Sequence, residues 1–307
     1  MGKSWFFGLR AGFFACLIAA SLFAPDAAAG GTIGVALLTR EHRFYQELEA
    51  GLRRQAYLTG YRLTVCYGEF DHIRQSAQVA SLIAKKVKAL IVAPCDSIAI
   101  GQSIIRANKA GIPVFTVDIA NLSGKGRVVS HIASDNREGG RLAGTLMAEA
   151  LKGAGKVVVI NHPNVTSVMD RVRNFKEYLR AYPRIEIVAD IPAWGQRDRA
   201  MAIMEDLLLM LPELKGVFAI NDDSALGAAT AIEAAGRGGE IVIVGYDGTP
   251  EAQRAIDEGR IYGDVIQYPQ EIGRLAMIAV RDHFAGRRVQ PHIPVPVGVY
   301  TGGGREE

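Results

Sequence analysis

The sequence predicts an α/β protein with two doubly wound lobes, each built on a parallel β-sheet. Short, continuous, β-branched apolar runs alternate with helical segments, which is typical of parallel sheets covered by helices on both faces. The alternation occurs twice in the 307 residues, on either side of a polar junction at residues 128–144, VVSHIASDNREGGRLAG. Because no low-complexity linker separates the halves, we expect several chain crossings between the lobes.

The first half predicts four strands and three helices. The strands are expected at residues 32–38, 61–67, 89–93 and 113–117. The helices are expected at residues 44–59, at 73–86, and from a cap at Asp96 or Ser97 to Gly111. In the first helix Phe44, Leu48 and Leu52 recur at helical spacing, and Gly60 is a natural stop.

The polar junction at residues 128–144 predicts a strand that runs directly into a helix. Asp135 and Glu138 have the spacing of an N-cap and its reciprocal partner. Apolar residues behind them recur at helical spacing, and Gly153 ends the pattern. A polar crossing between two similar halves is where a two-lobed protein bends, so we expect this junction to belong to a hinge.

The second half repeats the same plan. Its strands are expected at residues 156–160, 185–191, 217–220, 241–244 and 262–266. Helices fall between them, with stops at Gly236 and Gly259, and a last helix at 270–284 precedes a proline-punctuated tail. In doubly wound sheets ligands bind beyond the carboxyl ends of the strands. Two facing lobes of this kind are therefore expected to share one cleft.

The first 29 residues predict an export signal. Lys3 and Arg10 precede and flank an apolar run at residues 11–24, and Ala27 to Ala29 offer a cleavage site. The alternative is a permanent membrane anchor, which the short apolar run disfavours. The mature chain is therefore expected to be an exported, soluble protein that begins near Gly30.

Composition excludes several classes of protein. A net charge of +3 is too mild for nucleic acid to be the main partner. Cys66 and Cys95 are expected to be buried free thiols, and no Cys/His spacing suggests a metal site. The sequence has no P-loop, no G-x-G-x-x-G after the first strand and no nucleophile elbow, so we expect neither catalytic residues nor a cofactor.

Nearly every predicted strand ends in a group that can bind a polyol. Aromatic faces stack on the C–H faces of sugars, while carboxylates, guanidinium groups and carboxamides bond their hydroxyls. The strand-end groups include His42, Phe44, Tyr45, Asp118, His162, Arg171, Trp194, Asn221, Asp247 and Gln267.

Each of these residues also has a simpler interpretation. Phe44 fits a helix core, and Asp118 and Asp247 fit helix caps. Arg171 fits a solvated helix face and Trp194 fits packing, while the two histidines stay open as ligand contacts.

Several stretches together give a resemblance that covers the whole mature chain. They are TIGVALL with Phe44 and Tyr45, IPVFTVD at 112–118, VVSHIASDN at 128–136, FAINDDSALGA at 218–228 and VGYDGTPE at 244–251. The chain resembles the ribose-type periplasmic sugar-binding proteins, which have the type I periplasmic binding protein fold. This resemblance implies two Rossmann-like lobes joined by a three-crossing hinge, near residues 132–134, 267–268 and 296–297.

The resemblance also implies boundaries, partners and a role. The N-terminal lobe would be residues 30–132 with 268–296, and the C-terminal lobe 133–267 with 297–307. The protein would be a monomer in the periplasm that delivers a sugar or polyol to an ABC transporter permease. The alternative is a sensory protein that presents its closed form to a chemoreceptor or sensor kinase. A sugar-responsive transcription regulator would need a helix-turn-helix where this chain has an export signal.

Carried over by position, the resemblance implies ten ligand contacts. They are His42, Phe44, Tyr45, Asp118, Arg171, Trp194, Asn221, Tyr246, Asp247 and Gln267. The chain departs from the ribose pattern where His42 replaces an asparagine. It departs further where Leu38, Ala93 and Ile119 replace polar residues of the first lobe. We therefore expect a ligand with one edge that is less polar than in D-ribose, such as a deoxysugar, or a differently configured pentose or polyol.

Overall fold

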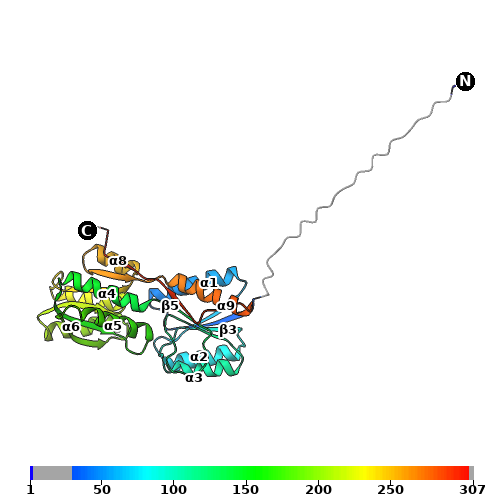
Figure 1. Cartoon of the computed structure of the whole chain (residues 1–307), viewed down its shortest axis with the longest axis horizontal. Coiled ribbons are helices and arrows are strands. Elements are labelled where there is room, and N and C mark those ends of the chain that lie inside the picture. Colours follow the sequence, from blue (N-terminus) through cyan, green and yellow to red (C-terminus); the bar gives the residue numbers. More distant parts are fainter. Residues whose placement is uncertain (3–29, 304–307) are drawn as a thin grey trace.

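In the computed structural model, which describes residues 1–2 and 30–303, the chain forms two six-stranded sheets (Figure 1). The first sheet has the order β11-β5-β4-β3-β1-β2 and the second β12-β10-β9-β8-β6-β7. The two α/β lobes predicted from the sequence are confirmed. Residues 3–29, which hold most of the predicted signal peptide and its cleavage site, and residues 304–307 lie outside the described residues.

The first lobe is a wholly parallel sheet between two pairs of helices. Its strands are β1 (Thr32–Leu37), β2 (Arg62–Tyr67), β3 (Ala89–Val92), β4 (Val114–Val117), β5 (Ser130–Ser134) and β11 (His292–Val295). Its helices are α1 (Arg43–Leu58), α2 (His72–Ala84), α3 (Ile100–Lys109) and α9 (Pro269–Phe284). Figure 1 shows α1 and α9 on one face of the sheet and α2 and α3 on the other.

The second lobe repeats this arrangement with one antiparallel edge. Its strands are β6 (Ala154–Asn161), β7 (Arg184–Pro192), β8 (Leu214–Ala219), β9 (Val242–Asp247), β10 (Gly263–Ile266) and β12 (Gly298–Tyr300). Its helices are α4 (Asn136–Ala150), α5 (Thr166–Leu179), α6 (Arg197–Met210), α7 (Asp222–Ala234) and α8 (Pro250–Asp257). Helix α4 packs against α5 and α6 packs against α7, while β12 runs antiparallel to β10.

The tail after residue 284 differs from its prediction. It supplies one edge strand to each sheet, β11 beside β5 and β12 beside β10. Proline is tolerated in β11 because an edge strand does not need every N–H for pairing. The proline-rich composition therefore concealed two strands.

Two predicted helix caps are wrong in part. Asp135 caps α4 by accepting from Glu138 N, but the Glu138 carboxylate bonds Arg141 and not the Asp135 amide. That amide donates instead to Val295 O at 2.8 Å. Of the two residues predicted to cap α3, Asp96 accepts from Ile98 N and Ala99 N just before the helix begins at Ile100, whereas the Ser97 hydroxyl accepts from the amide of a residue in the other lobe.

In the described residues the chain passes between the sheets three times. The passages lie at Asp135, at residues 267–268 and at 296–297, between the last element of one sheet and the first of the other. The Asp135–Val295 hydrogen bond joins two of these crossings. Together they form a compact connection at one side of the cleft.

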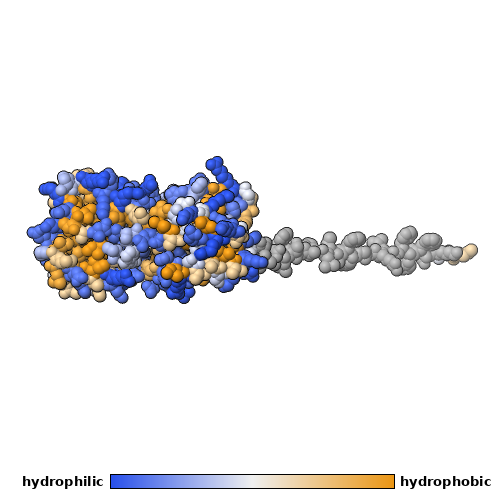
Figure 2. Space-filling model, turned by 90° about the horizontal axis from the view of Figure 1, so that it is seen from below, coloured by the Kyte–Doolittle hydropathy of each residue, from blue (hydrophilic) through white to orange (hydrophobic). Residues whose placement is uncertain are grey.

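Hydrophilic and apolar residues are interspersed on the face of the molecule that Figure 2 shows. Figure 2 shows hydrophilic residues over both lobes, with apolar residues in separate groups between them. No helix among the described residues is long and apolar enough to cross a membrane. Cys66 and Cys95 are free thiols; Cys95 is buried and Cys66 is half-buried.

Candidate functional site

A cavity of about 40 Å³ lies between the lobes at the carboxyl ends of the strands. Eight of the ten predicted contact residues line it, namely His42, Phe44, Tyr45, Asp118, Arg171, Asn221, Asp247 and Gln267. The predicted contacts Trp194 and Tyr246 do not line it. The sequence therefore identified most of the walls of one shared cleft.

The lobes contact each other at the mouth of this cleft. Thr166 N donates to Ser97 Oγ at 3.1 Å, and Ala120 N donates to Thr166 Oγ1 at 2.7 Å. Ser97 N donates to Asn164 O at 3.1 Å. The cavity has room for only about three waters, at about 10–15 Å³ each. The cavity is therefore small and is bounded by side chains of both lobes.

Asp118 is the main polar group of the first-lobe wall. Its Oδ2 accepts the Tyr45 hydroxyl at 2.6 Å, while its Oδ1 is buried without a partner. Burial raises the pKa of the Asp118 carboxyl, and Arg171 acts in the opposite direction. Asp118 has a φ of 59°, which is uncommon outside glycine. It caps no helix, and it lines the cavity.

Arg171 is the cation of the second-lobe wall, and it is buried rather than solvated. Its Nε donates to Asn136 Oδ1 and its Nη1 to Ile220 O, both at 2.8 Å. The guanidinium lies 3.8 Å from the centre of the Tyr246 ring, a cation–π contact. Tyr246 therefore supports Arg171 from behind, and its hydroxyl donates to Asn136 Oδ1 at 3.2 Å.

Two glycines allow this support to form. A Cβ on Gly140 would lie 2.3 Å from Arg171 O, and a Cβ on Gly139 would lie 1.9 Å from the Tyr246 hydroxyl. Both contacts are far too close for real side chains. The Gly139–Gly140 pair within the junction therefore lets α4 approach α5 and β9, which fixes the cation in the cleft.

Asp247 and Gln267 form the wall next to the hinge. Gln267 Nε2 donates to Asp247 Oδ1 at 2.7 Å, and Gln267 Oε1 is buried without a partner. Burial raises the pKa of Asp247 well above its usual value, with a further rise from Asp222, and Arg171 at 3.9 Å opposes both. Asp247 caps no helix, because Thr249 caps α8. Asn221 faces the cavity and also caps α7 through Ser224 N.

Aromatic rings close the outer side of the cavity. His42 lies 5.2 Å from Phe70, and His162 lies 5.7 Å from Trp194, between ring centroids. Phe70 and His162 approach across the lobes to 6.4 Å. His42 Nε2 lies 3.7 Å from Asp223 Oδ2 of the other lobe. Trp194 is thus separated from the cavity by His162, which lines it.

Burial lowers the pKa of both histidines. The pKa of His162 falls to about 4, with a smaller contribution from His42. The pKa of His42 is lowered by burial against the raising effect of Asp223. Both imidazoles are therefore neutral near pH 7 and can each donate one hydrogen bond and accept another.

Two of the three apolar residues that depart from the ribose pattern form an apolar edge. Leu38 and Ile119 line the cavity and are 3% and 2% exposed. Ala93 does not line it, because its side chain lies in the core and its carbonyl accepts from Gln75. The apolar edge therefore depends on Leu38 and Ile119.

Some cavity residues carried no signal in the sequence. They are Val165, Ser167, Val168, Gly195 and Ile220. Val165, Ser167 and Val168 lie at the start of α5, where a helix pattern does not show which face meets the other lobe. No group of three or more His, Cys, Asp or Glu in the described part of the chain could hold a metal ion.

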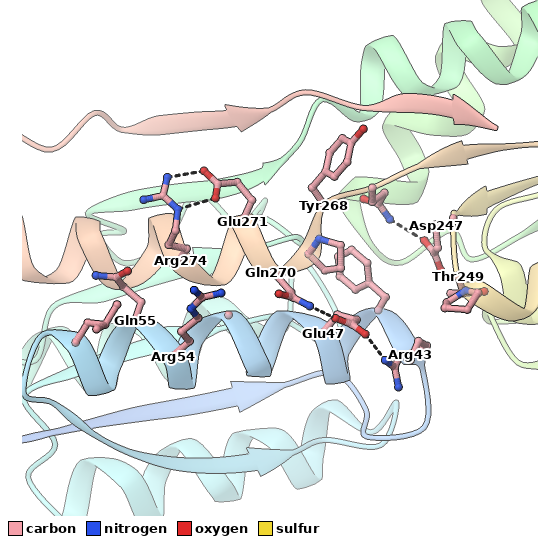
Figure 3. A pocket seen from close by; sticks show the side chains of 17 residues that line it. Arg43, Glu47, Arg54, Gln55, Asp247, Thr249, Tyr268, Gln270, Glu271 and Arg274 are labelled. Atoms are coloured by element: carbon pink, nitrogen blue, oxygen red, sulfur yellow. Dashed lines mark hydrogen bonds and ion pairs between the residues drawn. The ribbon is translucent and has the colours of Figure 1, made fainter. Parts of the chain in front are cut away.

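A larger groove of about 670 Å³ runs from α1 and α9 to the turn after β9 and shares Phe44, Asp247 and Gln267 with the cavity (Figure 3). Several of its polar residues bond one another: Glu47 pairs with Arg43 and Gln270, and Glu271 pairs with Arg274. The interlobe cavity contains two buried acceptors without partners, Asp118 Oδ1 and Gln267 Oε1, and the groove shares only Gln267. Because such acceptors call for a ligand, we take the smaller, interlobe cavity as the functional site.

This fold and cleft define a two-lobed protein that encloses a small polar solute. The chain belongs to the periplasmic binding protein domain family, whose model matches residues 33–288. It is 34% identical over 271 residues to the ribose import binding protein of Escherichia coli (strain K12), covering 88% of this chain and 90% of that protein. It is 29% identical over 252 residues to the D-apiose import binding protein of Actinobacillus succinogenes, covering 82% and 80%.

A solved structure shows the same likeness. An ABC transporter solute binding protein from Agrobacterium vitis, bound with alpha-D-tagatopyranose, superposes with a TM-score of 0.84. It is 28% identical, and the match covers 88% of this chain and 94% of that one. The resemblance to ribose-type periplasmic sugar-binding proteins is therefore confirmed.

Proposed function

We propose that this protein is an exported, monomeric solute-binding protein that captures a monosaccharide or related polyol and delivers it to an ABC importer. The observation that carries this proposal is the pair of unpaired acceptors, Asp118 Oδ1 and Gln267 Oε1, buried in one cavity. Each unpaired buried acceptor costs about 1–3 kcal/mol, which a ligand hydroxyl would recover. The import binding proteins among the relatives support transport and a periplasmic location.

The ligand is proposed to present one apolar edge to Leu38 and Ile119. A hydroxyl placed against these side chains would lose its partners, at about 1–3 kcal/mol. Deoxysugars and differently configured pentoses or polyols avoid this loss, whereas D-ribose does not.

A thermal-shift screen over pentoses, deoxyhexoses and polyols, followed by calorimetry on the hits, tests this proposal. We expect a deoxysugar or an alternative pentose or polyol to bind tighter than D-ribose. The variant Leu38→Ser restores a hydroxyl at this edge and is expected to shift preference toward D-ribose. D-ribose as the tightest ligand of the unchanged protein would contradict the proposed edge.

Binding is proposed to close the lobes about the three crossings. We assign residues 30–132 with 268–296 to one moving lobe and 133–267 with 297–307 to the other. The closed form, with ligand between Phe44 and the His162–Trp194 wall, is the one that the permease receives.

A reversible lock across the cleft mouth tests closure. Because Ser97 Oγ and Thr166 N are 3.1 Å apart, the pair Ser97→Cys with Thr166→Cys is placed to bridge the lobes when oxidised. Oxidation without ligand is expected to block sugar binding, and a reductant is expected to restore it. Ser97→Cys alone is the control. Unchanged binding by the oxidised double variant would refute the closing motion.

The remaining parts of the proposal have direct measurements. No catalytic residue and no cofactor take part, so incubated sugars should be recovered unchanged. The exported protein should start at or near Gly30 by intact mass, and light scattering should give a monomer. A sensory role toward a chemoreceptor or sensor kinase predicts that deletion removes a response to the sugar and leaves its uptake intact.

A further inference from the structure

Two buried carboxyl groups, Asp222 and Asp264, lie together beneath the cleft of the second lobe. Asp222 begins α7 and is 2% exposed, and Asp264 lies in β10 and is 0% exposed. No arginine or lysine in the described chain forms an ion pair with either. Buried carboxylates normally have such partners, so this pair needs another explanation.

The pair holds the turn that follows Asp247. Asp264 Oδ2 accepts from Gly248 N at 2.9 Å, and Asp222 Oδ2 accepts from Thr249 N at 2.7 Å. Asp247 has a φ of 133° and Gly248 a φ of 78°. A non-glycine residue keeps such a backbone only where its surroundings hold it. The two carboxyls supply that support on the side away from the ligand.

The two remaining carboxyl oxygens face each other. Asp222 Oδ1 and Asp264 Oδ1 are buried without a donor. They lie 3.2 and 3.3 Å from the position that a Cβ on Gly245 would take, so both approach the same point of β9. Ionised carboxylates only accept hydrogen bonds, so two of them side by side leave both oxygens unsatisfied. One proton between them satisfies both.

We propose that Asp222 and Asp264 share a proton, and that this acid pair positions Asp247 for the ligand. The pair does not touch the cavity, so its members are positioning residues. The role toward the ligand rests on the proposed function, while the shared proton does not.

The electrostatic surroundings agree with a retained proton. Burial, with Asp264 next, raises the pKa of Asp222 well above its usual value. Burial raises the pKa of Asp264 to about 7. The other titratable or charged groups on the elements around the pair are Asp223 and Glu233 of α7, Tyr246 and Asp247 of β9, Tyr300 of β12, Arg137, Glu138, Arg141 and Glu149 of α4, and Glu251, Arg254 and Asp257 of α8. Of these, Asp247 raises the pKa of Asp264 further through its charge.

This proton makes stability depend on pH with a definite sign. An aspartate in an unfolded chain titrates near 3.9. With a folded pKa of about 7, Asp264 stabilises the fold when protonated, and that contribution is lost as the pH rises from about 4 to 7. Asp264→Asn removes this titration, yet its amide can donate to Asp222 and its oxygen can accept from Gly248 N.

The experiment compares melting temperatures of the ligand-free protein and Asp264→Asn from pH 5 to pH 8. The melting temperature of the variant minus that of the unchanged protein should rise by about 3 °C per unit up to pH 7 and then level off. Asp198→Asn, which removes an exposed carboxylate of the same lobe, should show no such rise. A difference for Asp264→Asn that does not change with pH would overturn the shared proton.

Calorimetry with the best sugar from the screen tests the positioning role. Asp264→Ala should weaken binding at least about tenfold at pH 5, where circular dichroism reports whether it is folded, and Asp264→Asn should restore most of the affinity. Unchanged affinity in folded Asp264→Ala, or no rescue by asparagine, would overturn the role. If no sugar binds the unchanged protein, the proposed function fails, while the melting curves still decide the shared proton.

Discussion

Acidification from pH 7 to pH 5 is expected to weaken ligand binding through His162. This imidazole is 7% exposed in the closed cleft, between Trp194 of its own lobe and Phe70 of the other. Its pKa there is about 4, chiefly because burial disfavours the cation. When the lobes separate, Phe70 withdraws and water reaches the ring, so the pKa returns toward about 6.5.

The size of the effect follows from these two pKa values. A histidine with a lowered pKa in the closed form must lose its proton for the lobes to close. The closed form is therefore unaffected above about pH 6.5 and loses stability as the pH falls toward 4. Between pH 7 and pH 5 the change in proton binding lowers the affinity for the ligand about 20-fold.

Calorimetry at both pH values, on the unchanged protein and on His162→Gln, isolates this contribution. Glutamine keeps a donor and an acceptor but cannot take up the proton. Between pH 7 and pH 5 the affinity of His162→Gln should therefore fall by a factor about 20-fold smaller than that of the unchanged protein. Asp118 titrates in the opposite sense because its pKa is raised in the cleft, but it does so in both proteins. His72→Gln, on an exposed site of α2, is the matched control. Equal pH dependence in the unchanged protein and His162→Gln would refute the reasoning.

Three substitutions test the contacts that position the polar residues of the cleft. Arg171→Lys loses the bonds to two fixed oxygens, so calorimetry should show a loss of affinity of about 10- to 100-fold and thermal denaturation a melting temperature lower by several degrees. Gly139→Ala places a Cβ 1.9 Å from the Tyr246 hydroxyl, so thermal denaturation should show a melting temperature lower by several degrees, about 2–4 °C per kcal/mol of strain. Tyr45→Phe removes the donor to Asp118, and titration should show ligand binding weakened about 5- to 10-fold; unchanged affinity would exclude that contact from the site.

The sequence predicted the strands that are continuous apolar runs. It missed the strands that form only because another strand offers them an edge to pair with. Strands such as β1 and β3 are continuous apolar runs, so their burial is visible in the chain itself. Strands β11 and β12 are short and largely exposed, β11 contains Pro294, and both strands form because β5 and β10 offer free edges. Ser97 likewise fits a helix cap locally, and only the closed lobes show that it bonds Thr166.

The same distinction separates the predicted and unpredicted parts of the cleft. Polar residues directly after strands, such as Asp118 and Asp247, were predictable because parallel strands end at one edge. Tyr246 precedes Asp247 in the chain, and alternation in β9 directs it to the opposite face, where it supports Arg171. Ser167 lies within α5, and no strand end marks its place beside the cavity.

The junction at residues 128–144 connects the hinge to the ligand cation. Asp135 bonds the neighbouring crossing through Val295 O, and the next residue, Asn136, accepts from Arg171 Nε. Since Asn136 and the crossing are adjacent in one rigid helix start, a rotation at Asp135 must carry the support of Arg171 with it. Under the proposed closure, a ligand hydroxyl that engages Arg171 would act through Asn136 on the segment next to this crossing.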